Sequence, residues 1–161
     1  MYSKNTYRQE LDLQDMQYIQ NLHPVFDTVL DTYKCVKKPK VVGHVTLLDA
    51  LYKIKYNLGQ DVTPDLFLTN KYVEDKRNPV YDRKKERLPA VCYNAGFNGY
   101  KNLNNTKTIH NLMFLDIDCF QSRQEALDYK AEVIRKYEWI LACNLSLSKT
   151  GLHIIARVDR I

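Results

Sequence analysis

The chain has 161 residues, of which 45% are hydrophobic and 27% are charged, as in a globular protein with a core of its own. No apolar run approaches the ~20 residues that a membrane helix requires, and residues 1–5 do not lead into the apolar segment of a signal peptide. We therefore expect a cytoplasmic protein with no membrane partner. The net charge is +5, and residues 81–161 carry 13 basic against 9 acidic side chains, which favours a polyanionic partner.

The four cysteines are far apart in the sequence and include no Cys-x-x-Cys pair. They are Cys35, Cys92, Cys119 and Cys143. Zinc ribbons and disulfide frameworks need closer or more regular spacing, so we expect neither. We expect reduced thiols that are mostly buried.

The first half of the chain predicts an arm, a strand and a helix. Residues 1–24 form a polar N-terminal arm with a loose apolar stripe, and residues 25–36 alternate as a strand does. Residues 37–40, Lys-Lys-Pro-Lys, are expected to form a basic turn. Thr46 is a suitable cap for a helix that ends near Gly59. The predicted buried face of this helix consists of Leu47, Leu48, Leu51, Ile54 and Leu58.

The second half predicts further strands and one more helix, after an exposed charged connector over residues 69–87. The strands are expected at Leu88–Phe97, Leu112–Asp118, Trp139–Leu147 and Leu152–Val158. Ser122 caps a helix over residues 123–137, with Glu125 in its first turn. Its inward residues are expected to be Ala126, Leu127, Val133, Ile134 and Tyr137. This order predicts an α+β fold with helices packed on a mixed or antiparallel sheet.

The strand ending in Asp116 and Asp118 is the first candidate site. Carboxylates two residues apart in a strand project from the same face, and two adjacent like charges are costly unless a cation lies between them. Carboxylate oxygens suit Mg²⁺ or Mn²⁺, so Asp116 and Asp118 are candidate metal ligands and catalytic residues. Alternatively, the two acids merely end a strand and face water.

A second segment, about thirty residues later, carries groups suited to phosphate. These candidate nucleotide-binding residues are Ser146, Ser148, Lys149, His153 and Arg157. Gly151 is expected to occupy a positive-φ turn position. Two alternatives remain open: His153 is also consistent with a core histidine, and Lys149 is equally consistent with the solvated tip of a hairpin.

Basic and aromatic residues between the two halves suggest a nucleic-acid surface. The candidate basic contacts are Lys84, Lys85, Arg87 and Lys101. Aromatic side chains that could stack on bases beside them are Tyr93, Phe97 and Tyr100. The alternative for these aromatics is that they complete a hydrophobic core.

Together these motifs resemble the archaeo-eukaryotic primase superfamily, and more closely the VirE N-terminal type of primase-polymerase domain found in mobile elements. The resemblance rests on the Asp116-x-Asp118 strand, the helix after it and the Ser-x-Ser-x-x-Gly-x-His segment over residues 146–153. Leu-Pro-Ala at residues 88–90 and Gly-Phe at residues 96–97 precede the acidic strand, as in that family. The family's Ser-Gly-x-Gly turn is Ser-Lys-Thr-Gly here.

The resemblance implies a primase-like, RRM-derived core over residues 25–161 and a function in two-metal nucleotidyl transfer on a nucleic-acid template. The implied partners are a nucleoside triphosphate, a single-stranded DNA template and a helicase domain or protein. The family's third acidic motif lies beyond the histidine strand, and the chain stops at Ile161. We therefore expect the domain to be incomplete and inactive alone. The alternative function is a non-catalytic module that binds single-stranded nucleic acid in mobile-element replication or excision.

Overall fold

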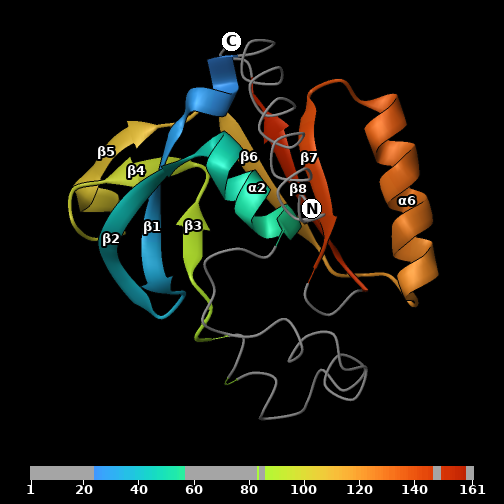
Figure 1. The fold of residues 1–161 in the computed structure, drawn as a ribbon, viewed down its shortest axis with the longest axis horizontal. Coiled ribbons are helices and arrows are strands. Elements are labelled where there is room, and N and C mark those ends of the chain that lie inside the picture. Colours follow the sequence, from blue (N-terminus) through green and yellow to red (C-terminus); the bar gives the residue numbers. More distant parts are fainter. Residues whose placement is uncertain (1–23, 57–82, 84–85, 147–149, 159–161) are drawn as a thin grey trace, which may run out of the picture.

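The computed structural model describes residues 24–56, 83, 86–146 and 150–158 (Figure 1). Its strands are β1 (Val29–Cys35), β2 (Lys38–Thr46), β3 (Ala90–Cys92), β4 (Ala95–Phe97), β5 (Thr106–Ile109), β6 (Leu112–Ile117), β7 (Ile140–Leu145) and β8 (Leu152–Arg157). Its helices are α2 (Leu47–Tyr56) and α6 (Arg123–Lys136), with short 3₁₀ helices η1 (Pro24–Asp27) and η2 (Leu103–Asn105). The strands form three small sheets, ordered β2-β1-β3, β4-β5 and β6-β8-β7.

The expected fold class is wrong. We predicted an α+β fold with helices packed on a mixed or antiparallel sheet and an RRM-derived, primase-like core. Instead, the described residues are mostly strands in three small sheets, every pairing is antiparallel, and there are two α-helices. The apolar run from Leu88 to Phe97 does not form one strand but breaks into β3, which pairs with β1, and β4, which pairs with β5.

The β1–β2 hairpin corrects a second prediction. Residues 37–40 were expected to be a turn, but the turn occupies Val36 and Lys37, and β2 begins at Lys38. Pro39 is compatible with a strand here because β2 is an edge strand of its sheet, where a missing ladder N–H is tolerated. The predicted strand over residues 25–36 is confirmed for Val29–Cys35, although Pro24–Asp27 is a 3₁₀ helix.

Both α-helices begin where their caps predict. Thr46 Oγ1 accepts the Asp49 N–H at 3.1 Å, and Ser122 Oγ accepts the Glu125 N–H at 3.1 Å. These bonds satisfy backbone donors that the first turn leaves without a helical partner. Two inward assignments are wrong, because Ile54 is 43% and Ile134 is 50% exposed. The predicted Leu58 and residues 1–23 lie outside the described part of the chain.

The sheet β6-β8-β7 separates two hydrophobic cores, because side chains alternate between its faces. The first core joins it to β1, α2 and the loop after β3, and contains Leu30, Leu47, Ala50, Tyr93, Leu112 and Ile155. The second joins it to α6 and contains Ala126, Val133, Cys143, Leu152 and Ile154. Figure 1 shows β1 to β5 on one side of this sheet and α6 on the other. Burial on both faces explains the continuous apolar run in β8.

Two further observations concern the burial of the cysteines and the length of the helices. Cys35, Cys92 and Cys143 are buried, Cys119 is exposed, and all four are free, as the sequence predicts. Among the described residues, neither helix has the length and apolarity needed to span a membrane.

Candidate functional site

The strand register brings the acidic strand and the histidine strand together at one end of the sheet β6-β8-β7. Asp116 of β6 lies opposite His153 of β8, which in turn lies opposite Asn144 of β7. Asp116 Oδ1 and His153 Nε2 are 3.5 Å apart, with side chains 60% and 30% exposed. A carboxylate and an imidazole at this distance attract each other when the ring is protonated. Both also remain open to solvent, so a ligand can reach them.

Aromatic packing supports the His153 ring. Phe114, two residues before Asp116, contacts His153 with ring centroids 5.3 Å apart. Phe114 also stacks on Tyr93 at 5.4 Å with an interplanar angle of 9°. Tyr93 belongs to the buried core, and burial raises its pKa to about 12. Tyr93 is therefore a core residue rather than an exposed base-stacking one, whereas Tyr100 is 50% exposed.

Asp118 and Ser146 lie at the same end of the sheet, beside Gly151. The Ser146 N–H donates to the Gly151 carbonyl at 2.8 Å. A Cβ on Gly151 would lie 2.8 Å from both Asp118 Oδ1 and Ser146 Oγ, and 2.7 Å from the Ile117 carbonyl oxygen. Glycine is thus required at position 151 because these three oxygen atoms leave no room for a Cβ. The prediction of a positive φ at Gly151 is wrong. Among the described glycines, Gly99 has a positive φ, at 80°.

The donor set at this end of the sheet is dominated by oxygen. Asp116 and Asp118 are both exposed. Ser146 adds a hydroxyl group, and this residue is 9% exposed. No group of three His, Cys, Asp or Glu side chains is arranged to hold a metal ion within the described ranges. Two carboxylates nevertheless fit Mg²⁺ or Mn²⁺, because Mg²⁺ commonly binds through one or two carboxylates and completes its shell with water and ligand phosphates.

The structure places the other predicted nucleotide-binding residues differently. Arg157 lies opposite Leu112, at the other end of β8 from His153. Four residues of strand separate them, which is about 13 Å. The structure therefore does not bring Arg157 to the Asp116–His153 pair, and its role stays a prediction. Ser148 and Lys149 lie outside the described residues.

The predicted nucleic-acid contacts lie on other elements. Arg87 and Lys101 are exposed, and neither belongs to the sheet that carries Asp116. The Lys101 N–H donates to the Pro39 carbonyl beside β2, and its ammonium lies 6.0 Å from the centre of the Tyr33 ring. Lys84 and Lys85 lie outside the described residues.

Asn144 is a member of the site that the sequence did not single out. It completes the row Asp116–His153–Asn144 across three strands. Its side-chain amide donates to the Leu145 carbonyl at 3.2 Å, which leaves the amide oxygen as an acceptor. The available signal was an isolated amide within the apolar strand Ile140–Leu145.

Comparison with known proteins gives one match. Residues 83–161 match the model of a family described as BT4734-like, N-terminal domain. This part of the chain includes Asp116, Asp118, Ser146 and His153, whereas β1, β2 and α2 precede it. No curated protein and no solved structure matches the chain.

Proposed function

We propose that this chain is the nucleotide- and metal-binding part of a mobile-element primase-polymerase of the VirE N-terminal type, within the archaeo-eukaryotic primase superfamily. The reaction is two-metal nucleotidyl transfer on a single-stranded DNA template, and the expected location is the cytoplasm. The observation that supports the proposal most is the Asp116–His153 pair at 3.5 Å, because it joins the acidic motif to the Ser-x-Ser-x-x-Gly-x-His motif. Asp118 and Ser146 meet at Gly151 beside it.

Each residue at this end of the sheet has a role in the proposal. Asp116 and Asp118 hold Mg²⁺ or Mn²⁺, which when bound neutralises phosphate charge and activates the attacking hydroxyl. His153, when protonated, contributes a positive charge that attracts the bound phosphate, since its Nε2 lies at the acidic end of the sheet. The Ser146 hydroxyl donates a hydrogen bond to that phosphate. Asp116 also orients His153 through their 3.5 Å contact.

A two-carboxylate site predicts that metal and nucleotide bind together. Protein oxygens from Asp116 and Asp118 fill only part of a six-coordinate shell, so the triphosphate supplies further ligands. We therefore expect weak binding of Mn²⁺ alone and clearly tighter binding in the presence of a nucleoside triphosphate. This ordering distinguishes the proposed site from a structural metal site, which binds its metal without a substrate.

Isothermal titration calorimetry with Mn²⁺ and a non-hydrolysable nucleoside triphosphate tests the proposal. We expect Asp116→Asn/Asp118→Asn to weaken the binding by at least about tenfold, or 1.4 kcal/mol. The matched control is Asp128→Asn/Glu132→Gln, which removes the same charge from exposed positions of α6. Unchanged binding in the first variant, or an equal loss in the control, would refute the proposal.

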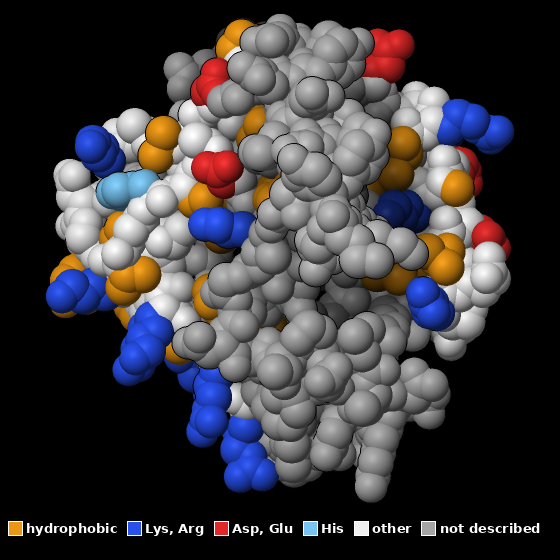
Figure 2. Space-filling model, viewed as in Figure 1, with side chains coloured by type: hydrophobic (Ala, Val, Ile, Leu, Met, Phe, Trp, Pro, Cys, Tyr) orange, Lys and Arg blue, Asp and Glu red, His pale blue; other side chains and the backbone are white. Residues whose placement is uncertain are grey.

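The alternative function, a non-catalytic module that binds single-stranded nucleic acid, is favoured by a separate surface. Exposed lysines gather on the β1–β2 hairpin, and Figure 2 shows Lys and Arg side chains concentrated on that side of the visible face. They are Lys34, Lys37, Lys38 and Lys40. Glu86 partly offsets them through an ion pair with Lys37 at 2.6 Å. A lysine cluster of this kind attracts a phosphate backbone.

Metal dependence separates the two functions. The alternative predicts that binding of an oligonucleotide in EDTA falls steeply with salt, because counterions are released. Replacing Lys38 and Lys40 by glutamine should then weaken binding and reduce the salt slope by about 1.4, since each phosphate contact contributes about 0.7 for a single strand. Asp116→Asn/Asp118→Asn should leave it unchanged. Loss of oligonucleotide binding on removal of metal would instead favour the catalytic proposal.

A further inference from the structure

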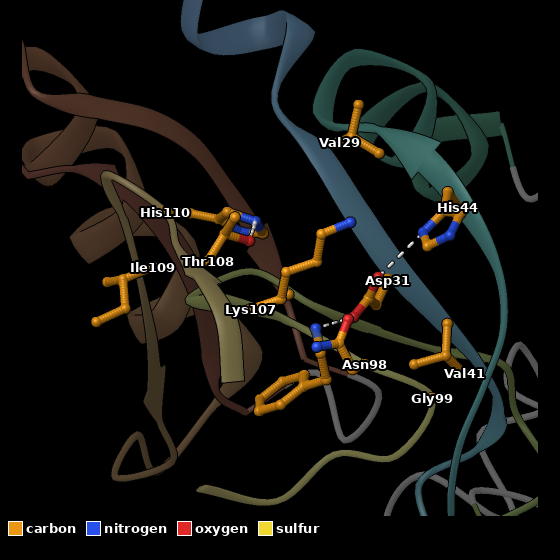
Figure 3. Close-up of a pocket in the computed structure, with 12 residues that line it drawn as sticks. Val29, Asp31, Val41, His44, Asn98, Gly99, Lys107, Thr108, Ile109 and His110 are labelled. Carbon is orange, nitrogen blue, oxygen red and sulfur yellow. Dashed lines mark hydrogen bonds and ion pairs between the residues drawn. The ribbon is translucent and has the colours of Figure 1, made fainter. Parts of the chain in front are cut away.

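A cavity of about 700 Å³ lies between the β1–β2 hairpin and the β4-β5 sheet (Figure 3). This volume falls within the ~300–1,000 Å³ that is usual for sites that bind small ligands. Val29 and Val41 contribute apolar walls, and Phe97 and Ile109 also line the cavity. Val29 and Ile109 are 57% and 69% exposed, which is unusual for such large apolar side chains.

A buried carboxylate anchors the cavity. Asp31 of β1 is 5% exposed, and its Oδ2 accepts the Phe97 N–H at 2.6 Å. Its Oδ1 lies 3.0 Å from Nδ1 of His44 on β2, as the dashed lines in Figure 3 show. These contacts fix the carboxylate between three strands. A carboxylate has about four acceptor positions, so it retains acceptor capacity toward the cavity.

Gly96 of β4 allows polar side chains of β1, β5 and the residue after β5 to approach one another closely. A Cβ built there would lie 2.7 Å from Thr108 Oγ1, 3.6 Å from His110 Nε2 and 3.8 Å from Asp31 Oδ2. The absence of a side chain at Gly96 therefore lets a hydroxyl, an imidazole and a carboxylate converge at the wall of the cavity. A convergent set of polar atoms in a mostly apolar pocket is the usual arrangement for ligand recognition.

These polar atoms are mainly acceptors. His110 Nδ1 lies 2.9 Å from the Tyr93 carbonyl oxygen, so Nδ1 carries the hydrogen of the neutral ring. Nε2 then accepts from the Thr108 hydroxyl at 3.4 Å. With its hydrogen committed to His110, the Thr108 oxygen remains an acceptor, as does Asp31 Oδ2, and both residues line the cavity. This part of the cavity wall is therefore suited to an N–H donor.

A cation lies at the opening of the same cavity. Lys107 of β5 is exposed, and Figure 3 shows its side chain extending into the space between His110 and Asp31. Its ammonium is suited to an anionic group such as a phosphate. The cavity thus offers acceptors from Asp31 and Thr108, apolar walls and an exposed cation.

We propose that this cavity binds a nucleotide whose base carries an exocyclic amino group. The amino group donates to Asp31 and Thr108, the base lies against the apolar walls, and the phosphate contacts Lys107. In protein–DNA complexes, Asp and Glu carboxylates accept a hydrogen bond from the amino group of cytosine in the same way. A free nucleotide and a nucleotide of a single strand offer this same chemistry. The site lies on other sheets than Asp116 and uses no metal, so it goes beyond the proposed function.

Calorimetric titration of the chain in EDTA with CMP and UMP tests the proposal. The two ligands differ in the group at position 4, an amino donor in CMP and a carbonyl acceptor in UMP. We expect CMP to bind at least about tenfold more tightly, because UMP leaves buried acceptors unpaired. Lys107→Gln should weaken both ligands about fivefold, as loss of an exposed charge contact does. The control Lys38→Gln, outside the cavity, should change neither.

A second variant perturbs this convergence of polar atoms without removing the carboxylate. Gly96→Ala/Thr108→Ala adds a methyl group where the polar atoms converge and deletes the hydroxyl that it would strike. We expect it to abolish the preference for CMP, whereas Thr108→Ala alone, which removes one of the two acceptors, should reduce it. Thermal unfolding of each variant reports whether the fold is preserved.

Oligonucleotides identify the source of the ligand. Tighter binding of oligo-dC than oligo-dT, without measurable binding of CMP, supports a single-stranded source. Binding of CMP itself supports a free nucleotide. The proposal would be overturned by equal binding of CMP and UMP, or by no binding of any of these ligands. It would also be overturned by equal binding of the two oligonucleotides without binding of CMP. Asp116→Asn/Asp118→Asn should leave all these affinities unchanged, so failure here is distinct from failure of the primase proposal.

Discussion

Substitution of Gly151 by alanine should destabilise the protein and impair the acidic site together. The new Cβ would lie 2.7 Å from the Ile117 carbonyl oxygen, and that strand position is held by the pairing of Ile117 with Leu152. A backbone oxygen in a paired strand cannot move away as a flexible side chain can. The other two close contacts, at 2.8 Å, are with Asp118 Oδ1 and Ser146 Oγ, which belong to the site itself.

The magnitude follows from two opposing effects. Overpacking of a buried position costs about 1–3 kcal/mol, and a clash with backbone lies toward the upper end of that range. The reduced conformational freedom of the unfolded chain offsets about 0.4–1 kcal/mol of it. We expect Gly151→Ala to lower the free energy of unfolding by about 2 kcal/mol, which corresponds to about 4–8 °C in Tm for a chain of this size.

Urea denaturation followed by circular dichroism measures this loss, and calorimetry with Mn²⁺ and a nucleoside triphosphate measures the site. The matched control is Gly43→Ala, where the closest contact is a side-chain oxygen, Thr32 Oγ1, at 3.2 Å. We expect the control to stay within about 1 kcal/mol of the wild type. A Gly151→Ala protein as stable as the wild type would show that the close approach of these oxygens does not exist.

Three further predictions concern buried groups. Burial raises the pKa of Tyr93 from 10.0 to about 12, so above pH 10 the folded chain keeps a proton that the unfolded chain loses. Stability should therefore fall between pH 10 and 12, and the part of this fall that is due to Tyr93, at most about 2.7 kcal/mol, should be absent in Tyr93→Phe, as urea titrations at each pH will show. Ellman's reagent should label Cys119 much faster than the three buried thiols, and Cys119→Ser should remove the fast phase. Asp31→Ala should cost about 1–3 kcal/mol of unfolding free energy, because the part-buried Phe97 N–H loses its acceptor, whereas Asp128→Ala on α6 should change it by less than about 0.5 kcal/mol.

Local signals in the sequence predicted the elements that local interactions determine. The caps at Thr46 and Ser122 placed the starts of α2 and α6, and their hydrogen bonds are confirmed. Strands β6 and β8 followed from continuous apolar runs that end in polar residues. Strand β5 was missed because all four of its residues are exposed and no apolar alternation marks it.

The assignment of strands to sheets could not be read from the sequence. Ala90–Cys92 and Ala95–Phe97 lie in one apolar run, yet they pair with strands about sixty residues upstream and about ten downstream. Hydrophobic pattern indicates that a segment is extended but not which partner it joins. The expected fold class failed for this reason, since it assumed that one sheet receives every strand.

The two candidate sites differ in how far the sequence reveals them. Asp116, Asp118, Ser146 and His153 stand in two short segments, so a motif can point to them before the structure shows that Asp116 and His153 face each other. The polar groups of the cavity come from β1, β2, β5 and the residue after β5. Their proximity depends on the packing of two sheets, and no spacing in the sequence encodes it.

A chain of contacts nevertheless joins the two sites through the core. His110, in the cavity, donates to the Tyr93 carbonyl, and the Tyr93 ring stacks on Phe114. Phe114 contacts His153, which faces Asp116. Tyr93 is 9% exposed, so its position is determined by packing. Tyr93 therefore orients the imidazole of His110 through its carbonyl and supports the imidazole of His153 through Phe114. The hydrophobic core is thus the common scaffold of the cavity and the acidic site.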